Sequence, residues 1–332
     1  MRRIAVIGAG SWGTTAAALA ARSTSTVIWA RRRELADAIN SRHENPDYLP
    51  GFRLPSELRA TDDIGECVGG ADAVVMAVPS HGFREVLEKL AHRIADHIPV
   101  ISLTKGIEQG SLATMTQIIA EECPGVRPSL IGVLTGPNLA SEIIDGQPTA
   151  AVVALGDKEA ARQIQGVFMG PSFRVYTNDD VVGCELGGAL KNVMAVAAGM
   201  SDGLGFGDNT RAALVTRALA ELTRLGVAMG GHPSTFAGLA GMGDLIATTS
   251  SAKSRNHRVG FGLAQGKTLD VVIDEMNMVA EGVKTTQAVL DLAARHEIEM
   301  PIAHHVGMVL YDGMHPRDAV LELMTRDARA EI

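Results

Sequence analysis

A glycine pattern near the N-terminus constrains the fold of this chain more than any other feature. The β-branched run Ile4–Ile7 leads into GAGSWG at positions 8–13, and an alanine-rich run, 14–22, follows directly. A strand that enters G-x-G-x-x-G and continues as a helix is typical of dinucleotide binding. Gly8 permits the tight turn, Gly10 permits close approach of a pyrophosphate, and Gly13 lets the helix pack on its strand. The pattern therefore predicts a Rossmann unit.

The rest of the chain divides into two kinds of pattern. After Ile4–Ile7, short apolar runs predict strands at 27–29, 73–78, 100–103 and 130–134, and two further runs, 150–155 and 173–176, extend the sheet. Apolar strands separated by helices indicate a parallel sheet covered on both faces. From residue 181 onward only helical patterns occur, at 182–200, 209–225, 255–265, 285–295 and 316–324. The predicted fold is α/β: an N-terminal Rossmann-type, doubly wound, mostly parallel sheet over 1–184, and an all-α C-terminal domain over 185–332.

Composition excludes several classes of protein. The 332 residues carry a formal net charge of −8, which disfavours nucleic acid and anionic membranes as partners. The three cysteines, at 67, 123 and 184, are widely spaced and form no C-x-x-C pair, so neither a disulfide framework nor a metal site is expected. Since no segment offers about 20 uninterrupted apolar residues, we expect no membrane insertion and a cytoplasmic location.

Basic residues follow the second predicted strand. That strand ends in Trp29 and is followed by Ala30, Arg31, Arg32 and Arg33, with no acidic residue before position 34. A site that prefers NAD usually places an acidic residue here on the ribose hydroxyls. Guanidinium groups instead match a 2′-phosphate in charge and geometry. The pattern favours NADPH over NADH and leaves use of both open; the alternative is a solvated basic helix start.

Polar residues also follow two later strands and interrupt one apolar helix. Lys105 comes just after the strand at 100–103, and Gly136 follows the strand at 130–134. Lys191 lies inside the apolar stretch 186–200, where a buried lysine needs a partner; Asp244 is the candidate. The alternative is that Lys191 reaches solvent along its aliphatic stem.

A cap at the start of a predicted helix completes the set of polar segments. Ser254 suits an N-cap position, and Arg255 and Asn256 follow it directly. A helix start beside an arginine attracts phosphate groups. An ordinary helix cap remains the alternative.

Together these segments resemble the bacterial NAD(P)-dependent glycerol-3-phosphate dehydrogenases over essentially the full length of the chain. The matching segments keep a shared order and spacing: 8–13, 77–80, 102–106, 136–137, 189–193, 207–210, 241–245, 254–256 and 280–282. The resemblance implies a helical second domain similar to that of 6-phosphogluconate dehydrogenase. It also implies interconversion of dihydroxyacetone phosphate and sn-glycerol 3-phosphate, supply of glycerophospholipid synthesis, and a homodimer.

The resemblance also implies residue roles. Lys191 would transfer the proton, and Lys105 would assist it. The implied substrate-binding residues are Lys105, Gly136, Asn138, Lys191, Asp244, Ser254, Arg255 and Asn256. The implied cofactor contacts are Gly8, Gly10, Ser11, Trp12, Gly13, Arg31, Arg32, Lys105, Ala140, Arg255, Val279 and Glu281. At position 138 this chain has Asn where the family usually has Ser or Thr.

Two other functions remain open from sequence alone. A β-hydroxyacid or 6-phosphogluconate-type dehydrogenase combines similar domains and also uses a helix lysine, but the segments 102–106 and 254–256 favour the glycerol phosphate interpretation. A non-catalytic NADPH-binding redox sensor would need the glycines and arginines, and would not need Lys105 or Lys191.

Overall fold

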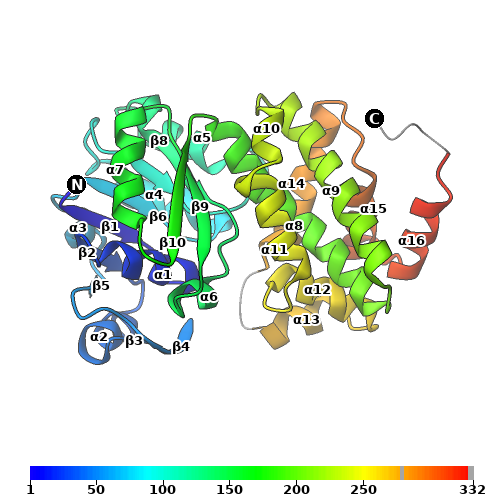
Figure 1. Cartoon of the computed structure of the whole chain (residues 1–332), viewed down its shortest axis with the longest axis horizontal. Helices are drawn as coiled ribbons and strands as arrows, with labels where there is room; N and C mark the ends of the chain where they lie inside the picture. Colours follow the sequence, from blue (N-terminus) through cyan, green and yellow to red (C-terminus); the bar gives the residue numbers. More distant parts are fainter. Residues whose placement is uncertain (277–279, 328–332) are drawn as a thin grey trace.

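The computed structural model describes residues 1–276 and 280–327 and shows two halves side by side, one built on a sheet and one helical (Figure 1). Eight strands form one sheet in the order β10-β9-β8-β7-β6-β1-β2-β5. Every neighbouring pair is parallel except β8 and β9, which are antiparallel. The strands are β1 (Arg3–Ile7), β2 (Ser25–Trp29), β5 (Arg59–Thr61), β6 (Ala73–Met76), β7 (Val100–Ser102), β8 (Ile131–Thr135), β9 (Thr149–Ala154) and β10 (Phe173–Asn178). The predicted mostly parallel sheet is confirmed.

Helices cover both faces of this sheet because successive strand residues point to opposite sides. In β1, Ile4 and Val6 pack in one apolar cluster with α1, α2 and α7, whereas Ala5 and Ile7 pack in another with α3, α4 and α5. The covering elements are α1 (Ser11–Ala20), α2 (Arg33–Arg42), α3 (Ile64–Val68), α4 (Phe83–Ala91), α5 (Met115–Glu122), α6 (Ala140–Ile144) and α7 (Lys158–Phe168), with short turns η1 (Ser80–Gly82) and η2 (Pro128–Leu130) and a hairpin of β3 (Glu44–Asn45) and β4 (Leu49–Arg53).

The second half is helical throughout the residues that the structure describes. Its elements are α8 (Val181–Gly203), α9 (Asp208–Ala228), α10 (Pro233–Phe236), the π-helical turn η3 (Leu239–Gly243), α11 (Asp244–Ser250), α12 (Arg255–Ala264), α13 (Leu269–Met276), α14 (Glu281–Arg295), α15 (Pro301–Tyr311) and α16 (Pro316–Met324). Helix α8 runs through the centre and packs against α9, α11, α12, α14 and α15. Among the described residues it is the one helix long and apolar enough to cross a membrane, and 83% of that apolar window is buried inside the protein.

Glycines explain why α8 and α12 approach so closely. A Cβ added to Gly199 of α8 would lie 1.9 Å from the His257 carbonyl oxygen, and one added to Gly260 of α12 would lie 1.9 Å from the Val196 carbonyl oxygen. Only glycine fits at both contacts. The close packing brings the start of α12 beside the middle of α8, where Lys191 lies.

Several predicted boundaries differ from the structure. The strand expected at 73–78 ends at Met76, and the strand expected at 100–103 ends at Ser102. Sequence analysis also missed several helices, among them α5, α7 and α15. The last strand ends at Asn178 and α8 starts at Val181, so the domain boundary predicted between 184 and 185 falls in the first turn of α8 and stays a proposal.

Candidate active site

The glycine turn leaves open space at the N-terminus of α1. Gly8 has a φ of +118°, and a Cβ there would lie 2.6 Å from the Ala77 carbonyl oxygen. A Cβ on Gly13 would lie 2.0 Å from the Gly8 carbonyl oxygen, whereas one on Gly10 would meet no described atom within 4 Å. No side chain caps the start of α1 within the described residues. The turn therefore fits a pyrophosphate group, which would accept hydrogen bonds from the free N–H groups.

Two neighbours of the turn have contrasting environments. The Ser11 hydroxyl donates to the Tyr48 carbonyl oxygen at 2.9 Å. The Trp12 indole nitrogen is buried and finds no acceptor among the described residues. Both residues stay predicted cofactor contacts.

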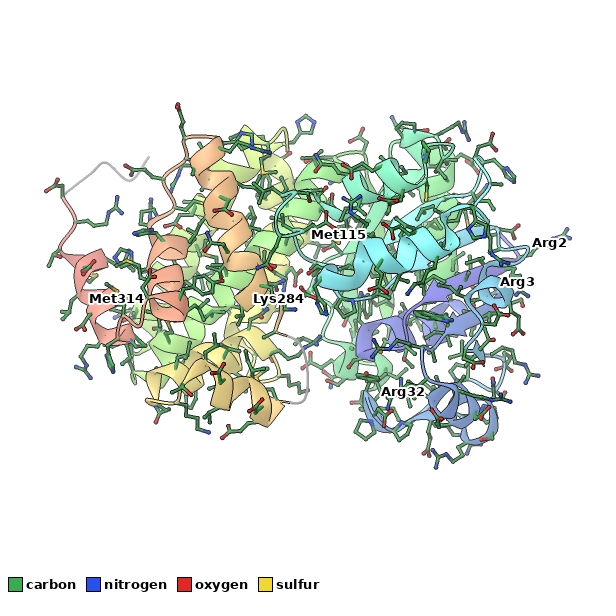
Figure 2. The ribbon with its side chains drawn as sticks, turned by 180° about the vertical axis from the view of Figure 1, so that it is seen from behind. Arg2, Arg3, Arg32, Met115, Lys284 and Met314 are labelled. Carbon is green, nitrogen blue, oxygen red and sulfur yellow. The ribbon has the colours of Figure 1, made fainter. Side chains whose placement is uncertain are left out.

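The arginines after β2 are exposed at the start of α2. Arg32 forms an ion pair with Asp47, and Figure 2 shows Arg32 in the lower part of the sheet-containing half. Arg31 is also exposed, one residue earlier. Both arginines stay predicted contacts of a 2′-phosphate, and Arg32 would then exchange Asp47 for the phosphate or share its charge with both.

One carboxylate holds both predicted catalytic lysines. Lys105 Nζ donates to Asp244 Oδ2 at 2.5 Å and to the Gly136 carbonyl oxygen at 2.9 Å. Lys191 Nζ lies 3.2 Å from the other oxygen, Asp244 Oδ1. The predicted pairing of Lys191 with Asp244 is confirmed, but its sharing with Lys105 was not predicted. The cluster joins the sheet-containing half to α8 and α11 of the helical half.

Two further side chains hold the Lys191 ammonium in place. Lys191 Nζ donates to Thr248 Oγ1 at 2.6 Å and to Asn192 Oδ1 at 3.2 Å, and Thr248 Oγ1 donates to Asp244 Oδ1 at 3.2 Å. Sequence analysis missed Thr248. Its spacing of four residues from Asp244 puts both on one face of a helix, which was the available signal.

Burial changes the acid–base chemistry of Lys191. The residue is only 4% exposed, so the alternative that it reaches solvent is wrong. Desolvation lowers the pKa of Lys191 from 10.5 to about 8; the Asp244 carboxylate opposes this shift, and the charges of Lys105 and Arg255 add to it. An ammonium with a pKa near 8 is charged at neutral pH and can still release its proton.

The start of α12 is tied to its neighbours. Ser254 caps the helix by accepting from the His257 N–H at 3.3 Å. Asn256 Nδ2 donates to Asn192 Oδ1 at 3.0 Å, and Asn256 Oδ1 accepts from the Gly282 N–H at 2.9 Å. Both polar atoms of Asn256 thus make bonds within the protein, while Arg255 is exposed at the first position of the helix. The phosphate-binding roles stay predictions.

The loop after β8 contains an unusual buried amide. Both Asn138 Nδ2 and Asn138 Oδ1 are buried without a hydrogen-bond partner among the described residues. A buried polar group without a partner costs free energy unless a ligand or water satisfies it. Nearby Gly136 has a φ of +128°, and Ala140 begins α6. The environment of Asn138 is consistent with its predicted contact to substrate.

Glu281 connects the halves on the other side of the site. Its carboxylate accepts the Ser80 N–H at 3.1 Å and also the Ser80 hydroxyl. Gly106 lies against this pair, because a Cβ there would be 2.6 Å from Ser80 Cβ. The predicted cofactor contact at Val279 lies outside the described residues.

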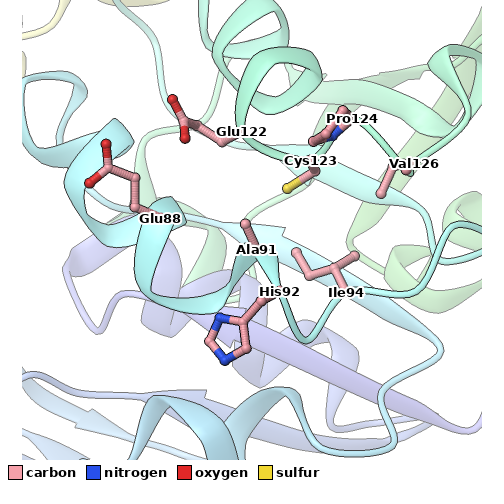
Figure 3. A pocket seen from close by; sticks show the side chains of 9 residues that line it. Glu88, Ala91, His92, Ile94, Glu122, Cys123, Pro124 and Val126 are labelled. Carbon is pink, nitrogen blue, oxygen red and sulfur yellow. The ribbon is translucent and has the colours of Figure 1, made fainter.

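Two surface cavities lie elsewhere, and the first is near α4. It has a volume of about 350 Å³ between α4 and the end of α5, and Figure 3 shows Glu88, His92 and Glu122 around it. A second cavity of about 340 Å³ lies between α12 and α13. Neither is lined by Lys105, Lys191 or Asp244, so the candidate site is defined by the lysine–aspartate cluster and the glycine turn.

A Rossmann half joined to a helical half through two lysines and a shared carboxylate defines a two-domain, dinucleotide-dependent dehydrogenase. A family model described as NAD-dependent glycerol-3-phosphate dehydrogenase N-terminus matches residues 3–161, and the C-terminus model matches residues 180–321. The chain therefore belongs to the NAD-dependent glycerol-3-phosphate dehydrogenase family.

Individual relatives agree with this assignment. A protein of Sphingopyxis alaskensis named glycerol-3-phosphate dehydrogenase NAD(P)+ 2 is 56% identical over 304 residues, 92% of this chain and 90% of the relative. A glycerol-3-phosphate dehydrogenase NAD(P)+ of Lysinibacillus sphaericus is 48% identical over 100% of this chain and 98% of its own. The crystal structure of glycerol-3-phosphate dehydrogenase from Coxiella burnetii has a TM-score of 0.93 at 36% identity and covers 98% of this chain and 99% of that chain.

Proposed function

We propose that this chain catalyses the reversible NAD(P)H-dependent reduction of dihydroxyacetone phosphate to sn-glycerol 3-phosphate, with Lys191 as the proton donor. One observation carries the role of Lys191: a buried ammonium with a pKa near 8 is held by Asp244 at the junction of the two halves. Family membership supports the reaction and its substrate.

The proposed chemistry divides between the cofactor and the protein. A bound dinucleotide supplies the hydride for the ketone carbon. Lys191 stabilises the negative charge that develops on the ketone oxygen and donates its proton there. In the reverse direction the neutral amine of Lys191 accepts the hydroxyl proton. Asp244 keeps Lys191 charged for reduction, and Lys105 adds a second positive charge beside the reacting oxygen.

Substrate binding is assigned to the groups around this cluster. Arg255, at the exposed start of α12, provides the charge for the phosphate, and Ser254 and Asn256 fix the helix that presents it. The phosphate is remote from the reacting carbon. Binding it immobilises the substrate and so reduces the entropic part of the barrier. The unpartnered amide of Asn138 and the backbone of Gly136 complete the proposed substrate contacts.

Cofactor binding is assigned to the glycine turn and to groups around it. Gly8, Gly10 and Gly13 shape the pyrophosphate site. The remaining proposed contacts are Ser11, Trp12, Arg31, Arg32, Lys105, Ala140, Arg255, Val279 and Glu281. We propose NADPH as the preferred cofactor because of the two arginines, a homodimer as the assembly, and the cytoplasm as the location, where the product feeds glycerophospholipid synthesis.

Replacement of Lys191 tests the catalytic assignment. Lys191→Ala should lower kcat for dihydroxyacetone phosphate by at least about 10²-fold, because the variant loses the proton donor. NADPH binding, measured by fluorescence titration, should remain within about threefold of the parent protein, since the glycine turn is untouched. Near-normal turnover would remove Lys191 from the proposed role.

Substrate choice separates this proposal from its nearest rivals. Dihydroxyacetone phosphate should support oxidation of NADPH, whereas 3-hydroxyisobutyrate and 6-phosphogluconate should not reduce NADP+. Activity with either of those two substrates alone would favour the β-hydroxyacid or 6-phosphogluconate-type dehydrogenase. No turnover with any of the three, with NADPH still bound, would favour the non-catalytic sensor.

Replacement of Arg31 and Arg32 tests the cofactor preference. Arg31→Ala with Arg32→Ala should weaken NADPH binding by roughly tenfold to a hundredfold, because bonds to a charged group contribute about 1.5–3 kcal/mol. NADH binding should change little, since it has no 2′-phosphate. Arg33→Ala is the matched control, and both Kd values are measured by titration. Equal losses for NADPH and NADH would contradict 2′-phosphate recognition.

A further inference from the structure

Glu185 is a buried carboxylate that the proposed chemistry does not use. It lies in the second turn of α8, six residues before Lys191, and is only 5% exposed. Its Oε1 accepts the Thr116 N–H at 2.9 Å, and its Oε2 accepts the Thr116 hydroxyl. Thr116 is the second residue of α5, so Glu185 bonds an otherwise free N–H group at the start of a helix in the other half.

The start of α5 is connected to Lys105 through a short loop. The β7–α5 loop, residues 103–114, contains Lys105 near its start and ends at Thr114, which caps α5. A β-bridge joins Ile107 to Thr114 and closes the loop on itself. Ile107 is also buried in the apolar core of the helical half. A displacement of Thr116 would therefore move the loop that carries Lys105. Figure 2 shows Met115, between the cap and Thr116, at the junction of the halves.

One face of α8 contacts both ends of this loop. Glu185, Gly188 and Asn192 follow at spacings of three and four residues, which places them on the same side of the helix. Asn192 Nδ2 donates to the Lys105 carbonyl oxygen at 3.3 Å. A Cβ on Gly188 would lie 3.4 Å from Lys105 Cγ, so the lysine stem passes over this glycine. Asn192 thus holds the Lys105 end of the loop and Glu185 holds the α5 end.

We propose that Glu185 is a positioning residue for the reaction: by holding Thr116 it sets the place of the β7–α5 loop on α8, and so the spacing between the Lys105 and Lys191 ammonium groups around Asp244. The inference rests on the proposed roles of Lys105 and Lys191. Each lysine bonds a different oxygen of Asp244, so a shift of the loop changes both the charge beside Lys191 and the bonds that hold Asp244.

The test compares two buried glutamates, each of which accepts a backbone N–H group at the start of another helix. Glu185→Ala should lower kcat by about tenfold to a hundredfold, because a displacement of about 1 Å at a reacting group costs up to about 10²-fold. It should also shift the pH profile of kcat, since desolvation together with the charges of Asp244, Lys105 and Arg255 sets the pKa of Lys191. Glu185→Gln, which keeps an acceptor for the Thr116 N–H, should restore most of the activity.

Glu221→Ala is the matched control. Glu221 of α9 is 3% exposed and accepts the N–H groups of Ile302 and Ala303 at the start of α15, so its bonds stay within the helical half. This variant should keep the parent kcat and pH profile at a temperature where it is folded. A parent-like kcat and pH profile in Glu185→Ala, or an equal loss of kcat in Glu221→Ala, would overturn the inference.

Thr116→Val provides a second variant if Glu185→Ala does not fold. It removes the hydroxyl donor alone. It should shift the pH profile of kcat in the same direction as Glu185→Ala does, with a smaller loss of kcat than in Glu185→Ala. If Glu185→Ala does not fold, a folded Thr116→Val with the kcat and pH profile of the parent protein would also overturn the inference. Retained turnover in Lys191→Ala, by contrast, would contradict the proposed function and not the contact of Glu185.

Discussion

At the scale of single residues, opposing charges and burial set the behaviour of Lys191. Desolvation lowers its pKa to about 8, and Asp244 limits the fall. Reduction needs the ammonium, so activity should be full below this pKa and should be lost as the pH rises through it. Asp244 is therefore the residue that extends reduction toward alkaline pH.

Asp244→Asn should move this alkaline loss to lower pH. The change removes the carboxylate that favours the charged lysine, so the pKa of Lys191 falls further. We expect the midpoint of the decline in kcat to move down by roughly one pH unit, which corresponds to about 1.4 kcal/mol. Profiles of kcat against pH for dihydroxyacetone phosphate reduction check this. Asp202→Asn, which removes a carboxylate paired with Arg211 and His257, is the control. An unchanged midpoint in Asp244→Asn would contradict the assignment.

At the scale of elements, the start of α1 shows how two glycines of one motif differ in role. Gly13 has no room for a side chain because the Gly8 carbonyl oxygen occupies the space. Gly10 has room for a side chain within the protein, so we propose that the bound pyrophosphate, and not the fold, requires glycine there. The sequence pattern alone does not separate these two reasons.

Alanine replacements distinguish them. Gly13→Ala should destabilise the fold by about 1–3 kcal/mol, as overpacking does. Gly10→Ala should unfold at nearly the parent denaturant concentration but bind NADPH at least about tenfold more weakly, because its methyl group would meet the pyrophosphate. Denaturant midpoints and NADPH titrations measure the two effects. Parent-like NADPH affinity in Gly10→Ala would place the pyrophosphate elsewhere.

At the scale of the whole molecule, an apolar cluster joins the two halves. Val133 and Val152 of the sheet pack with Cys184 of α8 and Ala240 of η3, and all four are buried. Burial raises the pKa of the Cys184 thiol to about 12, so this cysteine is an apolar packing group near neutral pH. Unfolding of either half would expose this shared surface, which couples the halves.

Coupling of the halves predicts coincident unfolding curves. Both tryptophans, Trp12 and Trp29, lie in the sheet-containing half, so fluorescence reports on that half, while far-UV circular dichroism is dominated by helices. The two signals should change at the same denaturant concentration, and NADPH should raise both midpoints together. Separate transitions, with only the fluorescence midpoint raised by NADPH, would show that the halves unfold independently.

The local pattern of residues was sufficient to predict much of the fold. The strand–glycine–helix order at 4–22 predicted β1, the turn and α1, because turn geometry depends on neighbouring residues alone. Apolar runs likewise predicted the central strands, because a buried strand is recognised from consecutive residues. Ends of elements were less predictable: Ala77 and Val78 continue an apolar run but leave the sheet, because β7 beside them pairs only as far as Met76.

The sequence by itself determined the glycine turn, the order of strands and helices along the chain, and the candidates Lys105, Lys191 and Asp244. Tertiary structure alone decided that one carboxylate serves both lysines, that Thr248 bonds to Lys191, and that Glu185 reaches Thr116. The physical reason is the separation along the chain between the groups that interact. Backbone conformation follows from adjacent residues, whereas the pKa of a buried ammonium depends on desolvation and on charges brought together by packing.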